Sequence, residues 1–521
     1  MRYFQRTYRI LIAALSAIGA SAYGQQPPDV VVSDSGNNTA MGTAALQSLI
    51  NNNNDDTAAG SHALAANTTG YGNSSFGAFS LPANTTGFYN TATGVAALFQ
   101  NSTGSANTAI GVHSLYANTA GGFNTAAGES SLSLNTTGSY NTAVGVEALQ
   151  GNTTASSNSA FGSLALATNA AGDDNTAIGA GALFSTMNSI ENTALGYDSL
   201  YANTSGADNT AVGSGSMYFN TTGYHNSAAG YQVLYSNTVG NHNTVSGYQA
   251  LYSNTNGDSN TAAGDEALYL NTTGYHNTVA GAQSMYSNET GNSNVAVGLE
   301  ALYSNTTGSG NVALGTSAGY KLTTGSNNVV IANQGVAADN GTIRIGTSGT
   351  QTSAYIAGIV GAKITGSAVF VTSSGQLGVL ASSERYKTEI GPMGPSTGGL
   401  AQLRPVRFHL KSDPNGPLQY GLIAEEVARV YPELVTRDAG GAIQGVRYEE
   451  LAPMLLNEMQ RLRAANQKRE AALEQRFSMQ ERQLKDLSRQ LVAMRNILDS
   501  RQVAQRARSE EQHLVSTLDP P

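Results

Sequence analysis

The chain has 521 residues, of which 12% are charged, and it contains 59 glycines and no cysteine, with a formal net charge of -9. The absence of cysteine excludes disulfide bonds and thiolate metal sites. The low share of charged residues and the abundant glycine favour a repeat array over the three or four globular domains that this length would otherwise suggest.

The first 22 residues have the features of a secretory signal peptide. Three arginines precede a short apolar stretch, residues 10–18, and Ala20–Ala22 fits the small-residue rule for cleavage. We expect cleavage near Ala22, with Gly24 as a second choice, and a linker over residues 23–37. A membrane anchor is disfavoured because the apolar stretch is too short to cross a bilayer. The mature protein is therefore expected to be secreted or attached to a bacterial cell surface, without a membrane span.

Residues 56–327 repeat every 17 residues in sixteen units, with the consensus N-T-A-x-G-x-x-A-L-Y-x-N-T-T-G-x-x, after an eighteen-residue unit over residues 38–55. A fixed short period with Gly and Asn at set positions is typical of a solenoid. Seventeen residues suit one coil of short strands and tight turns, whose left-handed backbone Gly and Asn tolerate. We therefore predict a mainly β fold, a parallel β-roll or β-solenoid over residues 38–327, with the Ala of position 3 and the Leu or Met of position 9 inside. The units would span roughly 80 Å at one strand spacing per coil.

Some rows of the repeat are candidates for binding. Position 10 carries tyrosine at Tyr116, Tyr201, Tyr218, Tyr235, Tyr252, Tyr269, Tyr286 and Tyr303. Such a row could be an adhesive stripe, or its rings could pack against a neighbouring chain or one another, which we favour. The Asn and Thr rows could bind glycans or ice, but ladders within the turns are the favoured interpretation.

The charges of the array exclude one class of ligand. There is no Lys or Arg between Arg9 and Lys321, whereas sixteen Asp and Glu are scattered there. A rod without cations cannot bind phosphate backbones, so nucleic acid is excluded as its partner. The acids lack the spacing of calcium-binding nonapeptides, and the histidines fall at scattered positions with no cysteine near them. We therefore expect no metal site and no cofactor.

The N-T-A-x-G repeats resemble the head domains of trimeric bacterial autotransporter adhesins, over residues 38–327. The resemblance implies a trimeric parallel β-roll and an adhesive rod. Two departures are the repeat length, which is usually a few residues shorter in such adhesins, and residues 515–521, which do not resemble their membrane β-barrel anchor.

After Asn327 the 17-residue period ends, and residues 328–381 are expected to form a β neck. Strands are predicted at residues 342–345, 355–359 and 368–371, between glycine-rich turns. No catalytic cluster occurs in this segment.

The composition changes after the neck, since 20 of the 26 Lys and Arg lie from Arg385 onward. The motifs there are Ser382-x-x-Arg385-x-Lys387-x-x-Ile390, Pro405–Phe408, Tyr420–Val427, Tyr431–Val435 and Tyr448–Leu451. This ordered set resembles the intramolecular chaperone auto-processing domain of phage endosialidases and tail fibres, over residues 382–454. The resemblance implies a domain that trimerises, folds the fibre before it and then cuts itself off.

Carried over by position, the resemblance implies that Ser382 is the nucleophile, Lys387 the base and Ala381-Ser382 the cleaved bond. Ser383 stands where many members have Asp, which is a departure from the family pattern. The lysine must be neutral to accept a proton, and burial can make it so. Residues five apart share no face of a strand or helix, so the segment must bend, and we expect trimer assembly to supply both bend and burial. The predicted activity is at most a single-turnover serine autoproteolysis without an external substrate.

Other polar residues of this module have weaker support. Glu425 and Glu426 lie on a predicted helix, residues 423–430, and could form an acid/base pair, but a solvated helix face is favoured. His409 is interpreted as a structural strand residue, with a role near Ser382 and Lys387 as the alternative.

A long helix is predicted from Leu455. The apolar residues keep alternating spacings of three and four, which predicts a trimeric coiled coil over residues 455–510 and a flexible tail over 511–521. They are Leu455, Met459 and Leu462 and, after a slip, Phe477, Leu484, Leu487, Leu491, Met494 and Leu498, with Gln480 among them.

These observations predict an exported homotrimeric fibre, adhesive or structural, whose C-terminal chaperone folds the rod and releases itself. The alternatives are a phage-type tail fibre and a non-cleaving surface solenoid that binds glycan or ice. The sequence does not name the glycan or protein ligand of the rod.

Overall fold

The computed structural model describes residues 32–33, 36–49, 55–356, 368–372, 374–438 and 440–515. The expected signal peptide lies outside these residues. The chain divides into two compact units, Met1–Tyr355 and Ile356–Pro521. In the described parts of the chain, no helix has a stretch long and apolar enough to span a bilayer.

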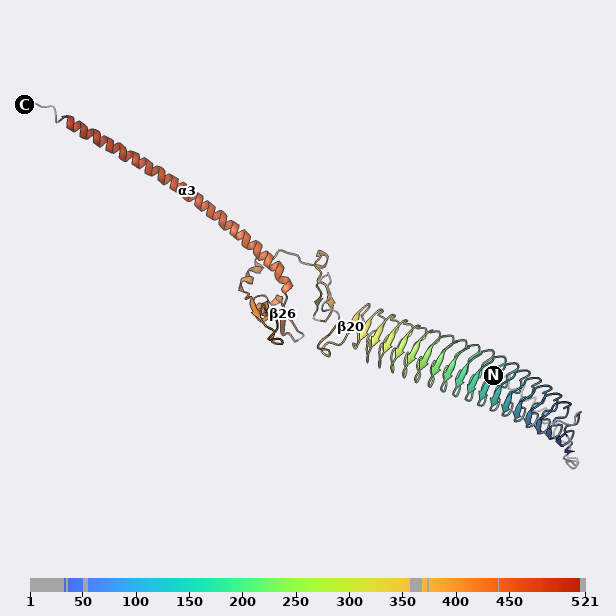
Figure 1. Ribbon diagram of the computed structural model, residues 1–521. Coiled ribbons are helices and arrows are strands. Elements are labelled where there is room, and N and C mark those ends of the chain that lie inside the picture. Colours follow the sequence, from blue (N-terminus) through green and yellow to red (C-terminus); the bar gives the residue numbers. More distant parts are fainter. Residues whose placement is uncertain are drawn as a thin grey trace, which may run out of the picture. The chain divides into compact units, whose positions relative to one another are not determined.

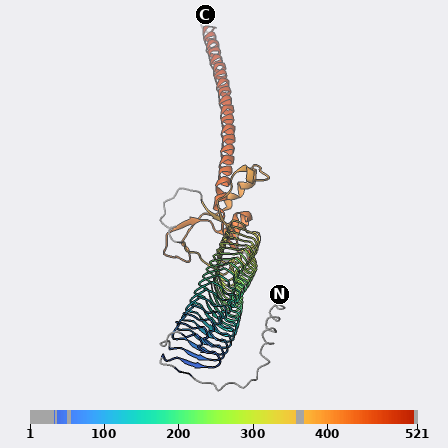
Figure 2. The same ribbon diagram turned by 90° about the vertical axis from the view of Figure 1, so that its right-hand side faces the viewer.

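The first unit is a parallel β-solenoid with one short strand in each coil, as predicted (Figures 1 and 2). Strands β2 to β20 pair in parallel, each with the next along the chain, and β1 is antiparallel to β2. The strands are β1 (Val32–Ser33), β2 (Thr39–Met41), β3 (Thr57–Ala59), β4 (Ser74–Phe76), β5 (Thr91–Thr93), β6 (Thr108–Ile110), β7 (Thr125–Ala127), β8 (Thr142–Val144), β9 (Ser159–Phe161), β10 (Thr176–Ile178), β11 (Thr193–Leu195), β12 (Thr210–Val212), β13 (Ser227–Ala229), β14 (Thr244–Ser246), β15 (Thr261–Ala263), β16 (Thr278–Ala280), β17 (Val295–Val297), β18 (Val312–Leu314), β19 (Val329–Ile331) and β20 (Ile343–Ile345).

The interior of the solenoid is formed by the two rows that the repeat predicts. The central residue of each strand points inward because side chains alternate along a strand, and Ala194 of β11 is fully buried. The Leu of position 9, as at Leu200, is also fully buried. Each coil contributes a small apolar surface, and stacking joins these surfaces into one core.

The backbone of the leucine row differs from expectation. The sequence assigns the left-handed conformation to Gly and Asn, but Leu200 also has a φ of 52°. This conformation costs about 1–2 kcal/mol in an L-residue. Burial of a leucine side chain contributes about 1.5–3 kcal/mol, and the Leu200 N–H donates to the carbonyl of Ser216 at 2.9 Å. Burial and this bond to the next coil therefore outweigh the strain.

The asparagine rows of positions 1 and 12 are buried ladders. At position 1, Asn107 donates from its backbone N–H and its Nδ2 to Oδ1 of Asn90, both at 3.1 Å. At position 12, Asn118 Nδ2 donates to Oδ1 of Asn101 at 2.7 Å and to the carbonyl of Gly121 at 3.0 Å. These four side chains are fully buried. The favoured ladder interpretation is therefore right for these rows, which present no amide to an external ligand.

The solenoid continues beyond the strict repeat, into the segment expected to be a neck. Asn328 extends the position-1 ladder by donating to Oδ1 of Asn311 at 3.0 Å, and β20 then pairs with β19. The coil closes with Arg344, which donates twice to the carboxylate of Asp339, at 2.5 and 2.6 Å. These hydrogen bonds lower the pKa of Asp339.

The other expected neck strands are only partly present. Tyr355 and Ile356 are not in a strand, and residues 357–359 lie outside the described residues. In the second unit, β21 (Phe370–Val371) and β22 (Leu377–Gly378) form a short antiparallel pair.

The rest of the second unit is small and contains both helices and strands. Its elements are the 3-10 helices η1 (Glu384–Tyr386), η2 (Gly394–Gln402) and η3 (Pro432–Leu434), the strands β23 (Val406–Phe408), β24 (Gln419–Gly421), β25 (Val435–Arg437) and β26 (Ile443–Val446), and the helices α2 (Ala424–Val430) and α3 (Tyr448–Val515). The strands pair antiparallel, β23 with β24 and β25 with β26. Asn457 of α3 donates to the hydroxyl of Thr397 in η2 at 2.6 Å, which fixes η2 to α3.

The core of this unit is limited to a few side chains. Val427, Tyr431, Leu434 and Val435 are the buried apolar residues among those described in it. The 68-residue helix α3 begins at Tyr448, before the expected Leu455. It exposes apolar side chains along its length, and Leu484 is 66% exposed.

Candidate functional site

The predicted cleavage segment bends at η1, between Ser382 and Lys387. Ser383 precedes the turn with an extended backbone, and its carbonyl accepts the N–H of Tyr386 at 3.0 Å. The N–H of Lys387 then donates to the carbonyl of Glu384 at 2.9 Å. One 3-10 turn therefore separates the predicted nucleophile from the predicted base.

The predicted pair is not assembled in a single copy. Ser382 and Lys387 are both exposed, as is every residue from 374 to 390. Across the described residues, no hydrogen bond joins the two side chains. The structure therefore contains the turn but not the burial that the proposed chemistry requires.

The alternative site residues have structural partners. Arg404 donates to both oxygens of Glu426, at 2.6 and 3.2 Å, and this bond lowers the pKa of Glu426. Such a carboxylate is poorly suited to act as an acid, and Glu425 lies exposed beside it. His409 Nδ1 donates to the carbonyl of Gly416 at 2.9 Å, across the loop between β23 and β24. These contacts agree with the structural interpretation of both positions.

A hollow beside α2 and β26 was not predicted from the sequence. It has a volume of about 280 Å³, and its lining includes Phe408, Glu425, Gln444 and Tyr448. The hydroxyl of Tyr448 accepts the N–H of Leu422 at 2.7 Å, which connects the start of α3 to the end of β24. The residues come from four separate elements, so no local sequence pattern could have indicated it.

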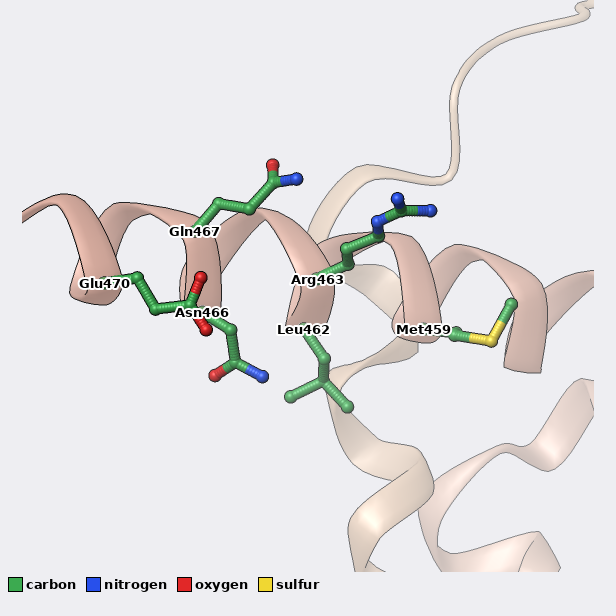
Figure 3. Close-up of a pocket in the computed structure, with 6 residues that line it drawn as sticks. All are labelled: Met459, Leu462, Arg463, Asn466, Gln467 and Glu470. Carbon is green, nitrogen blue, oxygen red and sulfur yellow. The ribbon is translucent and has the colours of Figure 1, made fainter.

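A second candidate surface lies along α3, between Met459 and Glu470. Figure 3 shows Leu462 and Asn466 projecting from one side of the helix and Arg463 and Gln467 from the other. Leu462 and Asn466 are four residues apart, which is the spacing of the predicted coiled-coil seam. Asn466 is thus a polar residue at a position of the predicted seam, and in coiled coils a polar residue at such a position fixes the register of the paired helices.

The tyrosine row of the solenoid forms a continuous stack. The rings of position 10 lie face to face from Phe184 to Tyr320, with centroids of successive rings 5.0–5.3 Å apart. The rings therefore pack on one another, as favoured, and their faces are covered by their neighbours.

The model of one protein family matches the C-terminal unit. Its description is "Chaperone of endosialidase", and it matches residues 382–436, from the predicted nucleophile into β25. Residues 382–436 form an endosialidase-type chaperone domain. Searches among curated proteins and among solved structures give no match. A β-solenoid followed by an endosialidase-type chaperone domain is the arrangement of a tail-fibre-like protein. The resemblance of the repeats to adhesin heads stays a prediction.

Proposed function

We propose that the protein is an exported homotrimeric fibre whose chaperone domain aligns three copies and then cuts the bond between Ala381 and Ser382. The observation that carries the proposal is the incomplete site, since the motif pair of an endosialidase-type chaperone domain is exposed in one copy. A cleavage site that lacks burial until copies associate would act only after assembly. Cleavage would then report correct folding.

Exposed apolar surface in the second unit supports association. Ile390 is 64% exposed, Tyr420 78% and Leu491 of α3 62%. An apolar seam along an isolated helix is unfavourable in water, and a coiled coil removes it. The partners that cover this seam are further copies of α3. Its apolar residues recur at spacings of three and four over many turns, so the seam is complementary to the same seam on another copy.

The chemistry follows from the peptide bond that is cut. In the assembled site, neutral Lys387 takes the hydroxyl proton of Ser382 as Oγ attacks the carbonyl carbon of Ala381. The carbon–nitrogen bond breaks, the lysine returns the proton to the departing amine, and an ester joins Ala381 to Oγ. Water then opens the ester, giving a carboxylate at Ala381 and restoring the Ser382 hydroxyl. The net reaction consumes one water molecule and needs no cofactor.

The released shaft can keep its fold because its core lies within one copy. The leucine row, the asparagine ladders and the strand pairing all join coils of the same chain. The chaperone domain is therefore needed to align copies and is dispensable afterwards. Export is part of the proposal and rests on the sequence of residues 1–22.

The test is to express the full chain and measure intact mass and migration on a denaturing gel, with and without boiling. We expect a fragment that ends at Ala381 in the wild type, and none in Ser382→Ala or Lys387→Ala. Ser383→Ala is the matched control, since it changes the adjacent serine, and it should still be cut. A fragment of the same mass from Ser382→Ala would refute the site assignment.

A surface-binding solenoid, or a phage-type tail fibre, is the second candidate. The strands turn two rows of side chains outward, the Thr of position 2 and an apolar residue at position 4. In the position-4 row, Ile178 and Leu195 are 41% and 43% exposed. An exposed face of this kind is suited to a glycan or to ice. Glycan-array binding and thermal hysteresis of the chain would distinguish the two ligands.

A further inference from the structure

The last position of the repeat forms a column of titratable side chains along the solenoid. Five consecutive repeats carry Asp174, Glu191, Asp208, His225 and His242 there. The backbone holds these residues in register, since the His225 N–H donates to the carbonyl of Ala207 at 3.1 Å and the His242 N–H to that of Tyr224 at 3.2 Å. Side chains of adjacent coils are therefore fixed one strand spacing apart.

Two imidazoles of this column face each other with a carboxylate behind them. Nδ1 of His225 lies 3.1 Å from Nε2 of His242. Nε2 of His225 lies 3.4 Å from Oδ2 of Asp208. The ring of Tyr224 packs edge-on against both imidazoles, with centroids 5.0 and 5.3 Å away. The rings are positioned by these contacts, and half of the His225 side chain remains open to solvent.

We propose that His225 and His242 together bind one divalent transition-metal ion, Zn²⁺ or Cu²⁺, and that Asp208 orients the ring of His225. Two nitrogens about 3 Å apart span adjacent ligand positions around an ion whose metal–nitrogen bonds are about 2.0–2.1 Å long. Imidazole is a favoured ligand for both ions. A ligating histidine usually donates its other ring N–H to a carboxylate, which is the place of Asp208.

The charge around the pair favours a cation. Asp174, Glu191 and Asp208 follow one another along the column, and the hydrogen bond and charge of Asp208 raise the pKa of Glu191. No Lys or Arg occurs between Arg9 and Lys321 to balance these acids. An ion at the imidazoles would lie at the end of this acidic run and join two coils of the solenoid.

The site would have two protein ligands, with water in the remaining positions. Within the described parts of the chain, no group of three or more His, Asp or Glu side chains could hold an ion. From the sequence we expected no metal site, because the histidines fall at scattered positions. His225 and His242 are one repeat apart, so the solenoid places them on adjacent coils.

The experiment is a calorimetric titration of the full chain, expressed without a polyhistidine tag, with Zn²⁺ and with Cu²⁺. We expect one site per chain, and at least tenfold weaker binding in His225→Ala and in His242→Ala. Asp208→Asn keeps both ligands and should weaken binding about tenfold, the usual result of losing a carboxylate that orients a ligating histidine. Mg²⁺, which prefers oxygen ligands, should not bind at this site.

His276→Ala provides the matched control. His276 occupies the same column, but Ser259 and Ser293 occupy that position in the adjoining repeats, so its loss should leave the titration unchanged. Circular dichroism checks that each variant keeps the solenoid. The proposal fails if the wild type binds neither ion, or if His276→Ala weakens binding as much as His242→Ala.

Discussion

The two units of the chain differ in where their apolar side chains lie. The solenoid buries Leu200 and the other leucines of its row within a single copy, whereas α3 leaves Leu484 and Leu491 largely exposed. The solenoid therefore completes its core within one chain, whereas the C-terminal unit leaves apolar side chains in solvent. In the proposed trimer, partners would begin and align the fold, while neighbouring coils maintain it.

The largest expected effect comes from a charge on the seam of α3. Leu487→Asp should convert the proposed trimer into monomers and abolish cleavage, because a carboxylate in an apolar interface is strongly unfavourable. Sedimentation equilibrium and the gel assay check both results. Asn496→Asp adds the same charge off the seam and should leave the assembly intact. A wild-type chain that sediments as a monomer would contradict the comparison of the two units.

A cavity in the solenoid should have the next largest effect. Leu234 is fully buried, and Leu234→Ala should reduce the free energy of unfolding by about 2–5 kcal/mol, through lost burial and the cavity left behind. The matched control is Leu195→Ala, which alters a side chain that is 43% exposed on the outer face. This substitution should change the free energy of unfolding little. Denaturant unfolding of both variants provides the measurement. Equal losses would mean that the outer face is covered by another chain.

The buried carboxylate of Asp56 predicts a pH dependence at the N-terminal end of the solenoid. Asp56 stands where later repeats have Asn, and it accepts hydrogen bonds from Asn67 and Asn73. Burial raises the pKa of Asp56 from 3.8 to about 6, although these bonds lower it. The folded state thus holds the proton more tightly than the unfolded chain. The bound proton therefore stabilises the folded state. This stabilisation is complete below pH 3.8 and is lost as the pH rises to about 6.

The loss amounts to about 3 kcal/mol, because one pKa unit corresponds to about 1.4 kcal/mol. Amide hydrogen exchange of β3 at pH 4 and pH 7, corrected for intrinsic rates, measures it. Asp56→Asn restores the ladder residue and should remove the difference. A difference that persists in this variant would assign the pH dependence to another group.

The smallest expected effect is in the aromatic stack. Tyr252 stacks on Tyr235 and on Tyr269, with centroids 5.1 and 5.2 Å away. Tyr252→Ser removes two such pairs, each contributing about 0.5–1.5 kcal/mol beyond buried area. We expect a reduced melting temperature and unchanged assembly. A loss of trimer in this variant would instead place the row at an interface between chains.

The repeat made most of the solenoid predictable, since one coil specifies the next. Ala194 and Leu200 could be assigned to the interior from their positions alone. The left-handed backbone of Leu200 could not, because it depends on the bond to the following coil. The extension of the solenoid through Asn328 to β20 was missed because the spacing shortens from 17 to 14 residues between β19 and β20, while the hydrogen bonding continues.

The second unit was less predictable in its contacts than in its identity. The motif beginning at Ser382 indicated the chaperone domain, which the family match confirms. The hollow near Tyr448 and the pairing of Arg404 with Glu426 join residues distant in sequence. The pairing of the helices and the roles of Ser382 and Lys387 stay predictions, because they concern groups that one copy leaves in solvent.

The asparagine ladders give the solenoid a direction. Where consecutive coils carry Asn in the position-12 row, the amide donates toward the N-terminal neighbour and accepts from the C-terminal one, as between Asn118 and Asn101. At the N-terminal end of this row, the Asp56 carboxylate accepts from Nδ2 of Asn67 and has no side-chain N–H to donate. At the other, Oδ1 of Asn305 has no hydrogen-bond partner among the described residues. Because the two ends of a ladder are chemically different, a further coil could extend it only head to tail.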